Sequence, residues 1–392
     1  MKRITSLVLL VTLVATLSAG CGSQMNKTDE KDNQKGDVIK IGINYELSGD
    51  VASYGQSSVE GIELAIEQIN GAGGINGKKI EAVKYDNKSE PAEATTLASK
   101  LMTQDKVLAI LGPATSGSFK AEIPVALKNK IPVVSGSATA DDVTVDEKGV
   151  KEYAFRICFN DSYQGTAMAN FALKNLSKTK AVVIMDSSSD YGKGLAENFI
   201  KTFEAAGGTI VAREAYVAKD TDFNAILTKI KGKDFDVIFI PGYYNEAGLI
   251  IKQARALGID VPVLGADGFD SPTLLELAGA EALNNVYFSN HYSSLDQDPT
   301  VVKFIADFKA KYNKEPDAFN ALGYDLAKFV ADGIARSEKL TGESIKNALA
   351  ATQNFAGVTG SFSVDENHNP VKAIVVIGLK DGVQSTSEKV AQ

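Results

Sequence analysis

The sequence has few of the residues on which disulfides, metal centres and histidine catalysis depend. Its 392 residues include two cysteines, Cys21 and Cys158, and two histidines, His291 and His368. Two histidines and no cysteine cluster argue against a zinc site. If Cys21 is modified, Cys158 has no partner for an intramolecular disulfide, and its apolar neighbours predict a buried, inert thiol. We place His368 in a solvated turn, residues 365–370.

Sequence motifs of common enzyme classes are also missing. No G-x-S-x-G elbow is present. Gly77-Lys78 lacks the upstream glycine of a phosphate-binding loop, because Ala72 stands in its place. Gly192-Lys193-Gly194 begins like a dinucleotide fingerprint but lacks the last glycine. We therefore expect a protein that is not an enzyme and that needs no cofactor and no metal.

Long apolar runs are scarce, and the clearest one lies at the N-terminus. Lys2 and Arg3 precede a mostly apolar stretch, residues 6–17, and small residues precede Cys21. This order predicts a secretory signal over residues 1–20. A cysteine directly after the small residues is similar to a bacterial lipoprotein signal, so we expect lipid on Cys21. Ordinary signal cleavage that leaves a free thiol is the alternative.

The chain beyond the signal has no run close to the roughly 18 apolar residues of a membrane span. We therefore expect membrane attachment through the lipid anchor only, on the outer face of a bacterial cell membrane. Residues 21–37 are polar and charged, as in a disordered tether. The net charge is −8, or −10 once Lys2 and Arg3 are removed, and nothing in it favours nucleic acid.

Strand and helix patterns alternate along two series. In the first, strands at residues 39–45, 79–85 and 107–111 alternate with helices, one of which carries the apolar stripe Ile62, Ala65, Ile66 and Ile69. The second series has strands at 180–185, 209–217, 235–240, 261–264 and 286–291. This alternation predicts an α/β fold of doubly wound parallel sheets.

The C-terminal part breaks the alternation. Helical patterns at 301–312, 318–335 and 343–351 follow one another, and strands at 362–364 and 373–377 close the chain. Helices without a strand between them indicate that the chain returns to complete the first unit. Several strands would then cross between two lobes, which predicts a hinge and a ligand cleft.

Small polar residues follow two strands of the first series. Residues 111–118 come after the strand at 107–111, and residues 135–140 come after a strand at 131–134. Backbone N–H groups and a helix N-terminus at such loops suit a carboxylate or phosphate, and ligands sit beyond the carboxyl ends of parallel strands. An ordinary capped helix start is the alternative for either loop alone.

Several short segments, weak alone, recur in a characteristic order. They are residues 47–49 with 54–55, 70–77, 85–86, 112–118, 135–139, 190–194, 241–246 and 265–268. With these segments, the chain from about residue 38 onward resembles the substrate-binding proteins of branched-chain amino-acid ABC transporters, which have the type I periplasmic binding protein fold. The resemblance implies two doubly wound parallel-sheet lobes joined by a multi-strand hinge. We assign residues 38–158 and 291–360 to lobe 1, and 159–290 and 361–392 to lobe 2.

The resemblance also implies which residues hold the polar ends of an amino acid. Ser116, with the hydroxyl and N–H of Thr139, would bind the α-carboxylate. Asp267 would bind the α-ammonium, helped by the carbonyl of Ser137 and the Thr139 hydroxyl. A helix N-cap is the alternative role for Asp267. The leucine-binding proteins carry a small apolar residue at the position of Ser137 and a glutamate at that of Asp267, which leaves the particular amino acid open.

Aromatic residues would surround the remainder of the ligand. The resemblance places Tyr54, Tyr191 and Tyr243 around it, and Phe319 at its side-chain end. Tyr191 as a plain helix start, Tyr243 as a strand-end ring and Phe319 as a core residue are the alternatives.

Together these features predict a monomeric receptor for a free amino acid, leucine, isoleucine or valine. It would close around the ligand and deliver it to the permease subunits of an ABC transporter. Alternatives on the same fold are a receptor for a short amide, urea or an aromatic acid, and a sensor that presents its ligand to a signalling protein.

Overall fold

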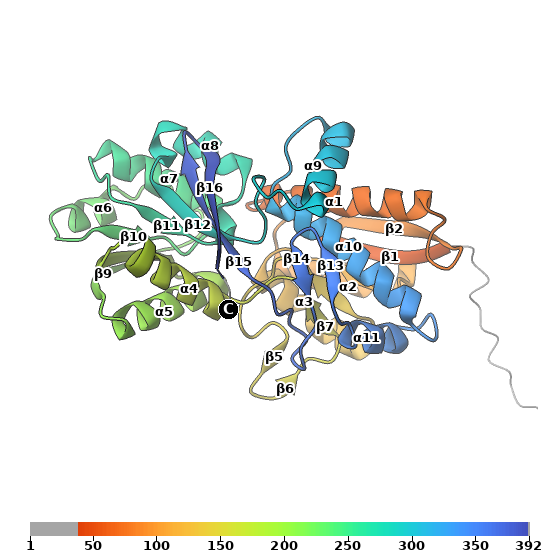
Figure 1. Cartoon of the computed structure of the whole chain (residues 1–392). Coiled ribbons are helices and arrows are strands. Elements are labelled where there is room, and N and C mark those ends of the chain that lie inside the picture. Colours follow the sequence, from red (N-terminus) through yellow and green to blue (C-terminus); the bar gives the residue numbers. More distant parts are fainter. Residues whose placement is uncertain (1–37, 391–392) are drawn as a thin grey trace, which may run out of the picture. The chain divides into compact units, whose positions relative to one another are not determined.

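The computed structural model describes residues 38–390 and contains two separate open sheets flanked by helices (Figure 1). The first sheet has the order β2-β1-β3-β4-β7, and all its strand pairs are parallel. Its strands are β1 (Val38–Tyr45), β2 (Lys79–Asp86), β3 (Ile110–Leu111), β4 (Val133–Ser135) and β7 (Ala154–Arg156). Most of β1 is buried, as expected for a parallel strand that helices cover on both faces.

Helices from both ends of the described chain pack on the first sheet. They are α1 (Ala52–Gly71), α2 (Pro91–Lys100), α3 (Ser116–Asn129), α9 (Pro299–Tyr312), α10 (Ala318–Arg336) and α11 (Gly342–Ala350). α1 packs against α10, and α2 against α3. Figure 1 shows the late helices, drawn in blue, beside the early elements in red and orange. The predicted return of the chain to its first unit is therefore observed.

The second sheet repeats the strand order of the first and then extends it. Its order is β16-β15-β12-β11-β10-β8-β9. The strands are β8 (Lys180–Asp186), β9 (Thr209–Tyr216), β10 (Val237–Phe239), β11 (Val263–Gly265), β12 (Val286–Asn290), β15 (Ile374–Lys380) and β16 (Val383–Val390). The helices beside it are α4 (Asp161–Asn170), α5 (Asp190–Ala205), α6 (Asn224–Lys231), α7 (Tyr244–Ala256) and α8 (Pro272–Ala278). β15 and β16 run antiparallel to their neighbours.

The described chain passes three times between the two sheets. The connections lie at residues 157–179, 291–298 and 363–373, between β7 and β8, after β12 and before β15. Two short hairpins complete the fold, β5 (Val145–Asp146) with β6 (Gly149–Val150) and β13 (Phe355–Gly357) with β14 (Gly360–Phe362). The second hairpin crosses the predicted lobe limit between residues 360 and 361, and the lobe limits stay predictions.

Some elements differ from the sequence-based expectation. The hairpin β5–β6 was not predicted. α4 and β16 were not predicted, because α4 has no clear apolar stripe and β16 is a polar, mostly exposed edge strand. The prediction for His368 was wrong: its side chain is buried, its ring stacks on Phe155 with centroids 4.0 Å apart, and Nδ1 lies 3.0 Å from the Ala154 carbonyl. Packing against β7 buries the His368 side chain, while Glu366 of the same turn is exposed.

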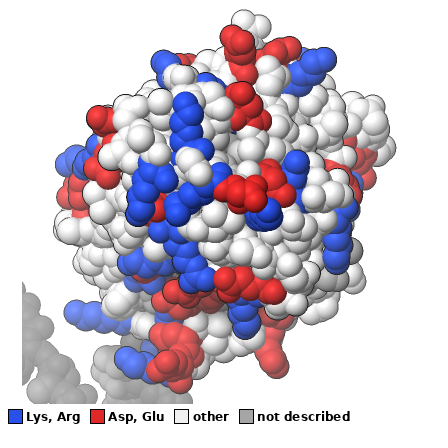
Figure 2. All heavy atoms as spheres, turned by 90° about the vertical axis from the view of Figure 1, so that its left-hand side faces the viewer, with Lys and Arg blue, Asp and Glu red and all other residues white. Residues whose placement is uncertain are grey.

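Charged side chains of both signs are interspersed on the face that Figure 2 presents. Ion pairs join β9 to the helices beside it, Arg213 with Glu204 of α5 and Glu214 with Lys229 of α6. Within residues 38–390, no helix is long and apolar enough to cross a membrane.

Candidate functional site

One narrow cavity lies where loops from the two sheets meet. Loops beyond the carboxyl ends of strands line it on both sides, which is the usual position of ligands in open α/β sheets. Its lining consists of Tyr54, Ala114, Thr115, Ser116, Ser137, Tyr191, Tyr243, Asp267, Gly268 and Phe319. All the ligand-contact residues predicted from the sequence are in this set except Thr139.

The side of the cavity that belongs to the first sheet consists of small residues, several with hydroxyl groups, and of the start of a helix. We call Ala114, Thr115, Ser116 and Ser137 the N–H pole. They lie in the loops after β3 and β4, and Ser116 is the first residue of α3. The Ser137 hydroxyl donates to the Ala114 carbonyl over 2.9 Å, so the two loops hold each other. The start of α3 adds the partial positive charge of a helix N-terminus.

A buried glutamate that the sequence analysis did not single out holds the N–H pole in place. Carboxylate oxygens of Glu46 accept hydrogen bonds from Ala114 N at 2.9 Å, Thr115 N at 3.1 Å and Thr115 Oγ1 at 2.9 Å. Burial raises the pKa of Glu46, while these hydrogen bonds oppose the rise. Its place directly after β1, at the same sheet edge as the loops, was the available signal.

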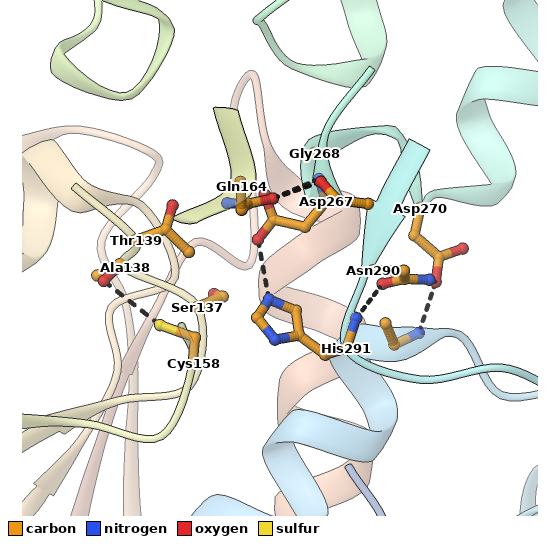
Figure 3. A network of polar contacts seen from close by, with 12 residues as sticks. Ser137, Ala138, Thr139, Cys158, Gln164, Asp267, Gly268, Asp270, Asn290 and His291 are labelled. Atoms are coloured by element: carbon orange, nitrogen blue, oxygen red, sulfur yellow. Dashed lines mark hydrogen bonds and ion pairs between the residues drawn. The ribbon is translucent and has the colours of Figure 1, made fainter. Parts of the chain in front are cut away.

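The opposite side of the cavity carries a buried carboxylate. Asp267 directly follows β11 and Ala266, and opens a short 3₁₀ turn, Asp267–Phe269. Its Oδ1 accepts a hydrogen bond from Tyr191 Oη at 2.7 Å. Its Oδ2 lies 3.1 Å from His291 Nε2, a contact that Figure 3 shows. Its backbone N–H donates to Gln164 Oε1 over 3.2 Å. We call Asp267, Tyr191 and His291 the carboxylate pole.

The ring of His291 is neutral in this setting. Its side chain is 1% exposed, and burial lowers its pKa to about 4, against the opposing influence of Asp267. Because Nε2 is the ring nitrogen that faces Asp267 Oδ2, we assign the proton to Nε2 as the donor of this contact. From the sequence, His291 was considered only as a base or metal ligand. The available signal was the position of His291 at the end of the predicted strand 286–291, at the sheet edge where ligands bind.

Aromatic rings form the wall between the two poles. Tyr54 stacks on Phe319 with centroids 4.3 Å apart, and Tyr191 stacks on Tyr243 at 5.0 Å. Tyr54 and Tyr243 meet edge to face at 5.7 Å. These rings give the cavity an apolar wall that suits an uncharged side chain.

Gly268 allows two tyrosine hydroxyls to meet the backbone beside Asp267. Its N–H donates to Tyr191 Oη over 2.9 Å, and its carbonyl accepts from Tyr54 Oη. A Cβ at this position would lie 2.9 Å from Tyr191 Oη and 3.2 Å from Tyr54 Oη. The close approach therefore requires glycine.

Several contacts join the two sheets around the cavity. Lys120 of α3 lies 2.5 Å from Asp190 at the start of α5, and Asp50 lies 2.9 Å from Lys219. With the Tyr54–Gly268 bond, these contacts describe a closed cleft. Closure excludes water and so strengthens polar contacts inside.

Two other predicted residues lie apart from the cavity lining. Thr139 is buried, and its Oγ1 has no hydrogen-bond partner among the described residues. Cys158 is a buried free cysteine, as predicted, and burial raises its pKa to about 12. Cys21, the predicted lipidation site, lies outside the described residues. Within residues 38–390, no group of three or more His, Cys, Asp or Glu side chains could hold a metal ion.

Comparisons with known proteins place this geometry in a family. The sequence pattern of the periplasmic binding proteins matches residues 38–384. The leucine-, isoleucine-, valine-, threonine- and alanine-binding protein of Pseudomonas aeruginosa is 31% identical over 331 residues, 84% of this chain and 86% of that protein.

Two solved structures extend the similarity. The branched-chain amino-acid transporter substrate-binding protein LivJ from Streptococcus pneumoniae, in complex with isoleucine, has a TM-score of 0.86 and 45% identity, covering 90% of this chain and 99% of that one. The leucine-binding protein LivK from Thermotoga maritima has a TM-score of 0.83 and 37% identity, covering 90% and 98%. The chain therefore belongs to the periplasmic binding protein family, and its fold is the type I fold of these solute receptors.

Proposed function

We propose that this protein captures a free branched-chain amino acid, leucine, isoleucine or valine, and delivers it to an ABC transporter. The observation that carries the proposal is the cavity with an N–H pole on one side and Asp267 on the other. An amino-acid zwitterion needs donors for its carboxylate and an anion for its ammonium, and buried charges must be paired. A solute without an ammonium group would leave Asp267 unpaired.

The aromatic wall supports an apolar side chain as the third element of recognition. Tyr54, Tyr243 and Phe319 line the space between the poles. The relatives with 31% to 45% identity are a leucine-, isoleucine-, valine-, threonine- and alanine-binding protein, a branched-chain amino-acid substrate-binding protein in complex with isoleucine, and a leucine-binding protein. In the proposed complex Ser116 binds the carboxylate, and the Ser137 carbonyl and Tyr191 support Asp267 at the ammonium. A contact from Thr139, which is buried outside the cavity lining, stays a prediction.

Delivery of the ligand begins with closure of the two lobes, whose boundaries lie near residues 158, 290 and 360. The lobe that carries Ser116 binds the ligand first, and the lobe that carries Asp267 then closes over it. The closed monomer docks on the permease subunits, and ATP hydrolysis by a separate subunit reopens it. Lipid on Cys21 anchors the receptor to the outer face of the cell membrane and raises its effective concentration near the permease.

Thermal unfolding of the full chain, purified in detergent and stripped of ligand by unfolding and refolding, tests the proposal. Each amino acid is added separately, with urea, short amides and aromatic acids as controls. A ligand at about 1,000 times its Kd stabilises the folded protein by roughly 4 kcal/mol. We expect leucine, isoleucine and valine to raise Tm by several degrees.

Other outcomes contradict parts of the proposal. A shift with small polar amino acids alone would keep the amino-acid class and reject the branched-chain assignment. A shift with an amide or aromatic acid and with no amino acid would reject the ammonium role of Asp267. Co-purification of the loaded protein with a signalling receptor in place of a permease would favour a sensor.

A further inference from the structure

A second side chain holds the carboxylate at the ammonium end of the cavity. His291 directly follows β12, close to where the chain leaves the second sheet. Its Nε2 lies 3.1 Å from Asp267 Oδ2. Its ring stacks on Phe159, with centroids 3.7 Å apart and 16° between planes. Phe159 lies in the connection that enters the second sheet, so the ring is fixed between two of the three connections.

The orientation of the His291 ring leaves its other nitrogen, Nδ1, without a hydrogen bond among the described residues. With the proton on Nε2, Nδ1 is an acceptor, and it is buried without a hydrogen-bond partner among the described residues. A buried polar atom without a partner is unfavourable for folding. The hydrogen bonds of the ring as a whole therefore do not explain this orientation, because Nδ1 has none. The contact between Nε2 and Asp267 does explain it.

A chain of hydrogen bonds fixes the backbone of His291. Its N–H donates to Asn290 Oδ1 at 2.9 Å, and Asn290 Nδ2 donates to Asp270 Oδ2 at 2.8 Å. The same Asp270 oxygen accepts from Ala318 N at 2.9 Å, one residue before Phe319 of the aromatic wall. Figure 3 shows this line from Asp267 through His291 and Asn290 to Asp270. The backbone that carries the ring is thus tied to both sheets.

We propose that His291 is a positioning residue that makes the receptor specific for amino acids over the same carboxylic acids without an ammonium group. The inference rests on the proposed function. The neutral ring donates to Oδ2 and Tyr191 donates to Oδ1, so both oxygens of the Asp267 side chain are held in place beside the cavity. Because the pKa of His291 is lowered to about 4 by burial, the ring brings no positive charge that would compete with the ligand's ammonium.

The alternative to a neutral donor shows why the residue type matters. A lysine or arginine at this place would also bind Asp267, but its charge would cancel that of the carboxylate. An apolar residue would leave Oδ2 of Asp267 buried with one donor fewer. A neutral donor holds the carboxylate and leaves its charge for the ligand.

Binding of two ligands to three variants tests the proposal. The ligands are L-leucine and 4-methylpentanoate, which has the same skeleton without the ammonium, measured by calorimetry on the full chain. We expect His291→Leu to weaken leucine binding about 10- to 100-fold and to change 4-methylpentanoate binding less than about threefold. His291→Gln, which keeps an N–H donor, should recover most of the loss. His368→Leu is the matched control, because His368 is also buried and also stacked on a phenylalanine but bonds the Ala154 carbonyl.

The positioning role would be overturned if His291→Leu lost the same affinity for both ligands. It would also be overturned if His291→Gln bound leucine as weakly as His291→Leu. Leucine binding that is unchanged in His291→Leu would do the same. Wild-type protein that binds 4-methylpentanoate as tightly as leucine would instead reject the ammonium role of Asp267, and with it the proposed function. The two failures are therefore distinguishable.

Nitrogen NMR of the wild-type chain gives a test that needs no folded variant. The sequence has only two histidines, so their four ring nitrogens can be resolved. We expect the His291 ring as the neutral Nε2–H form, and we expect leucine to shift its signals while those of His368 stay in place. A His291 ring protonated on Nδ1, or signals that leucine leaves unchanged, would contradict the proposal.

Discussion

The two poles of the cavity recognise opposite charges by different physical means. The N–H pole relies on hydroxyls and the start of α3, and the N–H groups of Ala114 and Thr115 donate to Glu46. The carboxylate pole places the charge of Asp267 at the cavity wall and supports it with two neutral donors, Tyr191 and His291. A buried formal charge is costly without its partner, so the second pole should discriminate between ligands more sharply.

Removal of the charge at the carboxylate pole should have the largest effect. Asp267→Ala leaves the ligand's ammonium unpaired in a closed cavity, which costs about 2–5 kcal/mol, or roughly 30- to 5,000-fold in Kd. Calorimetric titration with leucine measures it. Asp161→Asn is the control, because it changes a buried aspartate whose uncharged form is favoured. Burial raises the pKa of Asp161 well above its usual value, and the Asp267 charge adds to the rise. A comparable loss in both variants would remove the distinction between the poles.

The carboxylate pole should also give the protein a pH dependence. The pKa of His291 falls from 6.5 to about 4 on folding because of burial. Between these values the unfolded chain binds the proton and the folded protein does not, so stability falls as pH drops from 6.5 to about 4. His291→Gln removes this contribution. The free energy of unfolding of the wild type should decrease relative to the variant by up to about 3 kcal/mol over this range.

Urea unfolding of the two proteins at a series of pH values checks this expectation. Other groups titrate in the same range, such as Asp317, whose pKa burial raises to about 7, but they are common to both proteins and cancel in the difference. Asp267 and Lys372 are the charged groups that influence the ring. A difference that is flat between pH 6.5 and 4 would show that the ring titrates normally.

Ligand binding at the N–H pole should be weakened indirectly by a change of Glu46, which holds the loop of Ala114 and Thr115 in place. Glu46→Gln replaces an acceptor oxygen by an amide N–H that faces the donors of Ala114 and Thr115. Loss of these bonds costs about 1–3 kcal/mol, and we expect weaker binding of leucine and of 4-methylpentanoate alike, because both carry the carboxylate.

Glu122→Gln is the matched control for Glu46→Gln. Glu122 is also buried, burial raises its pKa well above the usual value, and it accepts from Asn44 Nδ2 at 2.8 Å, so the amide oxygen can take over. Calorimetry with both ligands separates the variants. If Glu46→Gln weakened leucine alone, the anchor would serve the ammonium end, contrary to the assignment of the poles.

Contacts outside the two poles should matter least. Lys120 bridges Asp142 and Asp190 at the rim and is partly exposed. Exposed ion pairs contribute little, so we expect Lys120→Met to change leucine affinity by no more than roughly threefold, with a smaller effect at high salt. A tenfold loss would mean that the rim, and not the poles, holds the cleft closed.

The difference between the poles is also a difference in what the sequence could predict. Residues 112–118 and 135–139 are recognisable because small polar residues follow apolar strands, and parallel strands bring such loops to one edge. The cavity contains Ser116 and Ser137 from these loops, and Asp267 and the rings placed by resemblance. The supports, Glu46, Gln164 and His291, were not predicted, because each acts on a residue that is distant in sequence.

The sequence by itself determined the alternation of strands and helices, the two doubly wound units and the return of the late helices, because period and turn chemistry are local properties. Only the tertiary structure decided that His291 meets Asp267, that Glu46 meets Ala114 and Thr115, and that His368 is buried. These outcomes depend on which strand ends share an edge and on how tightly side chains from three connections pack. No local pattern encodes distances of that kind, and burial, which sets the protonation of His291, follows from them.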